Sequence, residues 1–196
     1  KMPPEDRADH PSFLDGLVER GHTALELPFV KEFPWKEKQC AAFGELAAER
    51  NIQLSVHAPY FAVLTVIEAD RGKQAVSAME HTMKLGRELG APVIVAHLGA
   101  KHDEDPEVLT ARAEERLASI AGKVEGLGVG LGLETAGNAS SFGTLGDIAH
   151  LASEFPFVRP VVDWAHVHAM TGGGLTSVDA FESVFGFLKQ SFPGWM

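Results

Sequence analysis

Residues of types that bind metal ions recur along the chain at nearly even spacing. Each of four such residues follows a short apolar run: His57, His97, Glu134 and Asp163. The intervals between them are 40, 37 and 29 residues, and His166 lies three residues after Asp163. Imidazoles mixed with carboxylates favour Zn²⁺, Mn²⁺ or Fe²⁺ over Mg²⁺ or Ca²⁺, which prefer oxygen ligands alone. The sequence therefore predicts a divalent metal site, with zinc as the first choice.

The repetition of these residues is what favours metal binding. A single histidine at the end of a strand is more often a hydrogen-bonded core or surface residue than a ligand, and Asp163 alone could cap a turn. Two histidines and two carboxylates at equivalent points of four successive units are harder to explain in that way. Buried unpaired carboxylates are costly, and a shared cation is the usual resolution.

The segments that carry these residues alternate between strand and helix patterns. Strands are predicted over five runs: Thr23–Phe29, Ile52–Ala58, Pro92–Leu98, Gly128–Thr135 and Arg159–Ala165. Helices are predicted over Lys36–Arg50, ending at Asn51, over Gly72–Leu89, ending at Gly90, and after Asp105-Pro106. Further helix starts are predicted at two cap pairs, Thr144 with Asp147 and Thr176 with Asp179. Alternating strands and helices with short connections are typical of a parallel sheet.

A barrel explains the strand ends better than an open nucleotide-binding sheet does. No strand is followed by a Gly-rich phosphate loop, and Gly172–Gly174 lacks the Lys-Ser/Thr of a phosphate cradle. In a TIM (β/α)8 barrel the active site lies at the C-terminal ends of the strands. Gly130, Gly132 and Glu134 share one face of their strand, so Glu134 is expected to point inward at this rim. Glu26 ends the first strand and is a weaker candidate for the same site.

The bulk properties fit a single α/β domain, residues 1–196, outside the membrane. No apolar run is long enough to span a bilayer. The single cysteine, Cys40, cannot form an internal disulfide and is expected to be a buried filler in a cytoplasmic protein. The net charge of −10 disfavours a broad nucleic-acid-binding face. It does not exclude a phosphate substrate, because bound divalent cations can reverse the local field.

Four short motifs, taken together, resemble the successive motifs of the endonuclease IV family, within the xylose-isomerase-like TIM barrel superfamily. They are Val56-His57-Ala58-Pro59-Tyr60, Ala96-His97-Leu98-Gly99, Leu133-Glu134-Thr135-Ala136-Gly137 and Asp163-Trp164-Ala165-His166. The resemblance implies an enzyme with two or three metal ions that hydrolyses the DNA backbone on the 5′ side of an abasic site.

The resemblance also implies a role for each site residue. His57 and His97 would bind one zinc ion, and Glu134, the expected catalytic residue, would bridge it to a second ion bound by Asp163. His166 would bind a third ion, and Tyr60 would contact the substrate. The remaining family ligands are not found after Trp164. An incomplete barrel, lacking its first and last strands, is therefore expected.

Two other functions remain open at this point. One is a metal-dependent sugar isomerase or epimerase on the same barrel, acting on a sugar or sugar phosphate, where one ion polarises a ketose. Such enzymes commonly lack the two neighbouring histidines, so His57 and His97 favour the nuclease, whereas the negative charge favours the sugar enzyme. The other is a fragment that has lost a complete site and only binds a partner. The sequence gives no prediction of the oligomeric state.

Overall fold

The computed structural model describes residues 9–29 and 33–193, and its centre is a parallel sheet of five strands. In the order of the sheet these are β1 (Ala24–Pro28), β2 (Gln53–His57), β3 (Val93–His97), β5 (Gly130–Glu134) and β7 (Val158–Val161). Every neighbouring pair is parallel and follows the order of the chain. The predicted sequence of parallel strands is confirmed.

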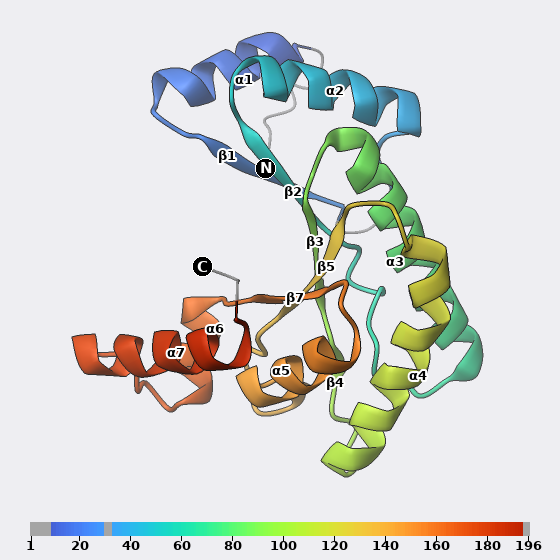
Figure 1. Cartoon of the computed structure of the whole chain (residues 1–196), viewed down its shortest axis with the longest axis vertical. Helices are drawn as coiled ribbons and strands as arrows, with labels where there is room; N and C mark the ends of the chain where they lie inside the picture. Colours follow the sequence, from blue (N-terminus) through green and yellow to red (C-terminus); the bar gives the residue numbers. More distant parts are fainter. Residues whose placement is uncertain (1–8, 30–32, 194–196) are drawn as a thin grey trace.

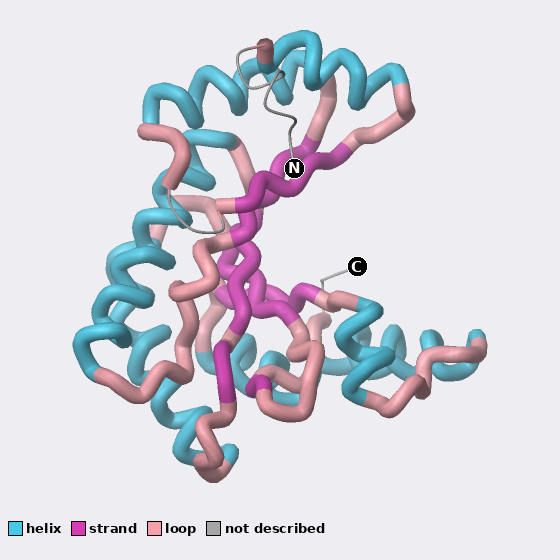
Figure 2. The backbone as a smooth tube through the Cα atoms, turned by 180° about the vertical axis from the view of Figure 1, so that it is seen from behind, coloured by secondary structure: helices cyan, strands magenta, loops and turns pink. Residues whose placement is uncertain are grey.

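Helices cover one side of this curved sheet (Figure 1). They are α1 (His10–Glu19), α2 (Glu37–Glu49), α3 (Ala69–Leu89), α4 (Pro106–Val124), α5 (Leu145–Glu154), α6 (Trp164–Met170) and α7 (Val178–Ser191). From α1 to α5 each helix packs against the next, and they form an outer arc around the strands, seen from behind in Figure 2. A curved parallel sheet inside an arc of helices is an incomplete α/β barrel, as predicted.

The two faces of β5 carry different residues, as this architecture requires. In β5, Leu131 and Leu133 are fully buried toward the helices, whereas Gly130, Gly132 and Glu134 occupy the inner face. The inner face has little room at Gly132, because a Cβ atom there would lie 2.6 Å from a methyl group of Val161. Glycine therefore lets β5 sit between its neighbours with Glu134 at its C-terminal end.

The longest helix confirms the predicted pattern of its buried face. Val76, Met79 and Met83 are buried in the core, and a Cβ atom at Gly86 would overlap the Ile94 side chain of β3. The helix ends at Gly90 in the left-handed conformation, with φ at 68°. Among the described residues no helix combines the length and apolar character needed to cross a membrane.

The structure departs from the predicted elements in four places. The helix α1 and a two-stranded antiparallel ribbon, β4 (Gly99–Ala100) with β6 (Ser141–Phe142), were not predicted. The prediction of a strand over Arg159–Ala165 is wrong beyond Val161, because α6 begins at Trp164. The predicted cap pair of α7 is wrong by one residue, since the Ser177 hydroxyl accepts the N–H of Ala180. The cap pair of α5 is confirmed: Thr144 and Asp147 form a capping box.

Candidate metal centre

Three of the predicted ligands meet at the C-terminal ends of β2, β3 and β5. His97 and Glu134 are direct partners across β3 and β5, and His57 is in register with Val95, which shares the face of His97. Parallel pairing therefore points all three side chains to the inner face. The Nε2 atoms of His57 and His97 each lie 3.4 Å from the same oxygen of Glu134, Oε2.

The protonation of this first group fits a cation that two imidazoles share. The Nδ1 atom of His57 lies 2.8 Å from the Ala58 carbonyl oxygen, which can only accept, so Nδ1 carries a proton. Its hydrogen bond with Glu134 raises the pKa of His57, whereas burial lowers the pKa of His97. Glu134 thus favours the protonated form of His57, and burial favours the neutral form of His97. When His57 loses its Nε2 proton, the Nε2 atoms of both histidines and Oε2 of Glu134 can bind the same cation.

A second group of three lies on the other side of Glu134. The ligand atoms of Glu134, Asp163 and His166 lie within 4.8 Å of one another, as do those of His57, His97 and Glu134. The Nε2 atom of His166 is 3.7 Å from Oδ2 of Asp163, and its Nδ1 atom is 3.5 Å from Oε1 of Glu134. Glu134 therefore belongs to both groups.

Asp163 lies at the start of a helix and not at the end of a strand as expected, and His166 lies in the first turn of that helix. Asp163 is the N-cap of α6, and its Oδ1 atom accepts the N–H of His166 at 2.9 Å. The other carboxylate oxygen, Oδ2, lies beside the His166 ring and is available to bind a cation. Asp163 can therefore cap α6 and act as a ligand at the same time. Trp164 is the first residue of α6. The His166 ring lies beside Asp163 and Glu134, and the third ion that the resemblance assigns to His166 stays a prediction.

Glu134 is the most buried charged group of the site. Only 8% of the residue is exposed, and within the described part of the chain its ion pairs are all with histidines. No lysine or arginine in that part of the chain neutralises it at ion-pair distance. A buried carboxylate surrounded by imidazoles is a donor set that a divalent transition-metal cation satisfies.

The other predicted residues lie near the two groups or away from them. Tyr60 is 62% exposed in the loop after β2, with its ring centroid 5.9 Å from that of His57, so its contact with substrate stays a prediction. Glu26 is on the same sheet face, accepts a hydrogen bond from Ser55, and belongs to neither group. Cys40 is fully buried, and burial raises its pKa to about 11, which confirms a packing role.

A cavity of about 300 Å³ adjoins both groups. His97 and His166 line one part of it, and the β4–β6 ribbon with the loop after β5 lines the rest: Gly99, Ala136, Gly137, Asn138, Ser141 and Phe142. The sequence did not indicate the ribbon residues, because a two-residue strand leaves no periodic pattern. Their position makes them the wall next to the candidate ligands.

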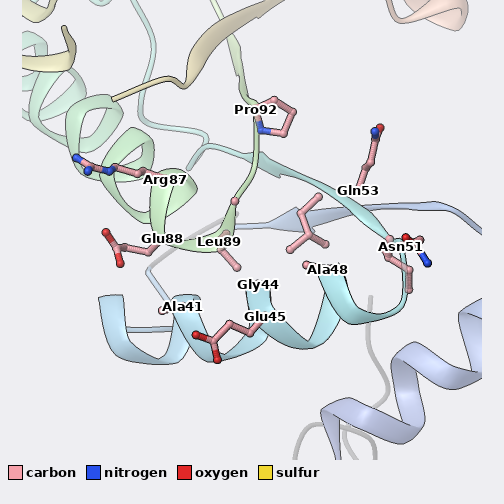
Figure 3. Close-up of a pocket in the computed structure, with 13 residues that line it drawn as sticks. Ala41, Gly44, Glu45, Ala48, Asn51, Gln53, Arg87, Glu88, Leu89 and Pro92 are labelled. Carbon is pink, nitrogen blue, oxygen red and sulfur yellow. The ribbon is translucent and has the colours of Figure 1, made fainter. Parts of the chain in front are cut away.

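A larger hollow lies at the opposite ends of the strands. Its volume is about 680 Å³, and its walls are the C-terminal halves of α2 and α3 with the starts of β2 and β3. Gly44, Glu45, Asn51, Arg87 and Glu88 surround it in Figure 3. It contains none of the candidate metal ligands. In a barrel of this kind active sites lie at the C-terminal ends of the strands, so the smaller cavity is the functional candidate.

Solved structures share this fold at low sequence identity. D-psicose 3-epimerase from Clostridium cellulolyticum H10 has a TM-score of 0.70 and 16% identity, over 92% of this chain and 66% of that one. SacUVDE has a TM-score of 0.69 and 13% identity, over 94% and 64%. The 3-keto-D-glucoside 4-epimerase YcjR from E. coli has a TM-score of 0.66 and 14% identity, over 97% and 84%. The chain thus spans just under two thirds of the first two proteins, and the likeness shows the fold alone.

The sequence comparison identifies the wider family. No curated protein sequence matches the chain. The model of one protein family, the xylose isomerase-like TIM barrels, matches residues 14–190, which include every candidate ligand. The superfamily predicted from the sequence is therefore confirmed, while membership of the endonuclease IV branch stays a prediction. The chain belongs to the xylose isomerase-like TIM barrel family.

Proposed function

We propose that this chain is a metal-dependent hydrolase of phosphodiesters, with DNA cleaved 5′ to an abasic site as the substrate that its motifs suggest. The observation that carries the proposal is the pair of three-residue groups that share Glu134. Each group offers one fewer ligand than a closed tetrahedral zinc site, as is usual where a catalytic ion keeps a position for water or substrate.

Divalent cations held by these residues would supply Lewis acidity for the attacking and leaving oxygens of an in-line displacement at phosphorus. The chain's own residues hold and orient this centre. His57, after losing its Nε2 proton, and His97 would present their Nε2 atoms on one side, and Asp163 and His166 would present Oδ2 and a ring nitrogen on the other. Glu134 links the two sides through its two oxygens. Tyr60 is exposed beside His57, where it can contact a bound substrate.

Epimerisation of a sugar is the second candidate. Solved structures of the same fold include D-psicose 3-epimerase and L-ribulose 3-epimerase, and most of the similar structures with a named activity are sugar epimerases. The group of Glu134, Asp163 and His166 alone could hold one ion that polarises a ketose carbonyl. The net charge of −10 also favours a small neutral substrate over a polyanion. In this reading His57 and His97 have no obligatory role.

The two functions are separated by the dependence of activity on His57. The protein is incubated with an end-labelled duplex that contains one abasic site and, separately, with D-psicose, each with EDTA and after Zn²⁺ or Mn²⁺ is restored. The hydrolase proposal predicts cleavage that EDTA abolishes and that His57→Ala lowers at least 100-fold. Conversion of the ketose that survives His57→Ala, together with an intact duplex, would establish the epimerase instead. Glu107→Gln, at an exposed position in the first turn of α4, is the matched control.

A further inference from the structure

Thr135, directly after Glu134, lies at the centre of the hydrogen bonds that hold the second group. It is 2% exposed, and its hydroxyl is engaged by the backbone of Asp163. We propose that Thr135, together with Gly137, is a positioning residue that sets the geometry of Asp163 and His166 and thereby the affinity for the second ion. This inference rests on the proposed function, because it takes Glu134 to be shared between two ions.

The Thr135 hydroxyl binds both backbone polar groups of Asp163. Oγ1 accepts the N–H of Asp163 at 3.0 Å and lies 3.3 Å from the carbonyl oxygen of Asp163, to which its proton is donated. Since β7 ends at Val161, no strand ladder extends to Asp163. The Thr135 N–H in turn donates to the Val161 carbonyl oxygen at 3.0 Å. One residue thus joins β5 to the segment that presents the Asp163 carboxylate.

The backbone of Thr135 also orients His166. The Nδ1 atom of His166 lies 2.9 Å from the Thr135 carbonyl oxygen, so Nδ1 carries the proton and donates it there. Nε2 is then the ring nitrogen that can bind an ion, and it lies 3.7 Å from Oδ2 of Asp163. A ligand histidine that donates its other ring N–H to a backbone carbonyl has its tautomer and ring direction fixed for metal binding.

Gly137 gives the His166 ring its place. A Cβ atom at Gly137 would lie 2.5 to 2.9 Å from three ring atoms of His166, including Nε2. Any larger residue would therefore push the ring away from Asp163 and Glu134. The stretch from Thr135 to Gly137 accordingly shapes the second group, whereas His57 and His97 depend on the pairing of β2 and β3 with the sheet.

The test compares Thr135→Val, which keeps the shape and removes the hydroxyl, with Thr135→Ser, which keeps the hydroxyl. Co²⁺ is titrated into the metal-free protein by calorimetry, while its d–d absorption is followed. We expect wild type and Thr135→Ser to bind two equivalents. Thr135→Val should bind the first equivalent normally and the second about 10- to 100-fold more weakly, the usual size of effect for an outer-shell partner. Gly137→Ala should weaken the same equivalent, and Asp163→Asn identifies which equivalent it is.

Each result either supports or overturns the inference. Thr135→Val that keeps both affinities would overturn it, as would equal loss of both, which a general defect of the fold would produce. If wild type binds a single ion, the two-ion function fails, and the inference then requires that Thr135→Val and Asp163→Asn weaken that ion alike. If wild type binds no ion, both fail. Thermal unfolding of the metal-free variants, with Thr135→Ser as the rescue, tests whether Thr135→Val folds. Should it not fold, Gly137→Ala decides in its place.

Discussion

The two halves of the candidate site are built in different ways although they share Glu134. His57 and His97 stand at the ends of neighbouring strands, and the register of the sheet alone brings their Nε2 atoms to 3.4 Å from one carboxylate oxygen. Asp163 and His166 stand at the start of α6, where a buried threonine and a capping carboxylate hold them. The strand half is fixed by backbone pairing, of β3 with β5 over five residue pairs and of β2 with β3 over two. The helix half depends on a few side-chain hydrogen bonds, so single substitutions should disturb it selectively.

The largest effect is expected when the negative charge of Glu134, which both halves share, is removed. In Glu134→Gln the amide is a much poorer ligand than the carboxylate, so both ions should bind at least 100-fold more weakly, roughly the loss expected when a buried charged partner is removed. Calorimetric titration with Zn²⁺ measures this, and Glu107→Gln serves as the exposed control. Retention of one ion at full affinity would show that the halves do not share Glu134.

A substitution at Arg116 should destabilise the loop beside the strand half without changing how the ligands bind an ion. Arg116 on α4 donates to the carbonyl oxygens of Leu64 and Val66, in the loop that follows Tyr60. Arg116→Met leaves these carbonyls without their donor, which costs about 1–3 kcal/mol of unfolding free energy when such groups are buried. Chemical denaturation measures the loss, with the exposed Arg71→Met as control.

The same variant should leave the first ion in place. His57 and His97 are held by strand pairing, so the affinity for the first Zn²⁺ should match wild type. A parallel loss of stability and of that affinity would mean that the loop, and not the sheet, positions the strand half.

The pH dependence of metal binding should differ between the two histidines of the strand half. Because Glu134 raises the pKa of His57 above its ordinary value of 6.5, the metal-free protein keeps that proton to a higher pH. The stability that this pair gives the metal-free fold is fully present below pH 6.5 and is lost as pH rises through the raised pKa.

A cation must displace the His57 proton, so the affinity for the first ion should rise about tenfold per pH unit up to that pKa and then level off. His97, whose pKa is lowered by burial, should not add a second proton in this range. Proton release counted by calorimetry in two buffers tests this, and a release of two protons near pH 7 would contradict it.

The smallest effect is expected from substitutions that separate the two roles of Asp163 in the helix half, as the cap of α6 and as a candidate ligand. Asp163→Asn keeps a cap for α6 and loses the charge, whereas Asp163→Ala loses both. Both variants should weaken the second ion, but only the alanine variant should lower the unfolding free energy of the metal-free protein, by about 1 kcal/mol. Equal stability of the two variants would mean that the cap contributes nothing.

The same contrast explains how much could be predicted from the sequence. The strands and the candidate ligand residues at their ends were predictable, because apolar runs with a polar residue at the end recur once per βα unit. The run Val161-Val162-Asp163-Trp164 looked like one more strand, yet Asp163 accepts an N–H from the following turn and starts a helix. From the sequence alone, Thr135 is only the last residue of a predicted strand, a position where threonine is common. Its role follows from hydrogen bonds to residues 28 and 31 positions away, which no local pattern records.

The measurement that tests the central claim most directly is anomalous diffraction at the zinc edge from crystals of the zinc-loaded protein. We predict two ions that both contact Glu134. One should be bound by His57 and His97, and the other by Asp163 and His166, with ligand distances of about 2.0–2.2 Å. A single ion, or two ions of which one has no contact with Glu134, would contradict it.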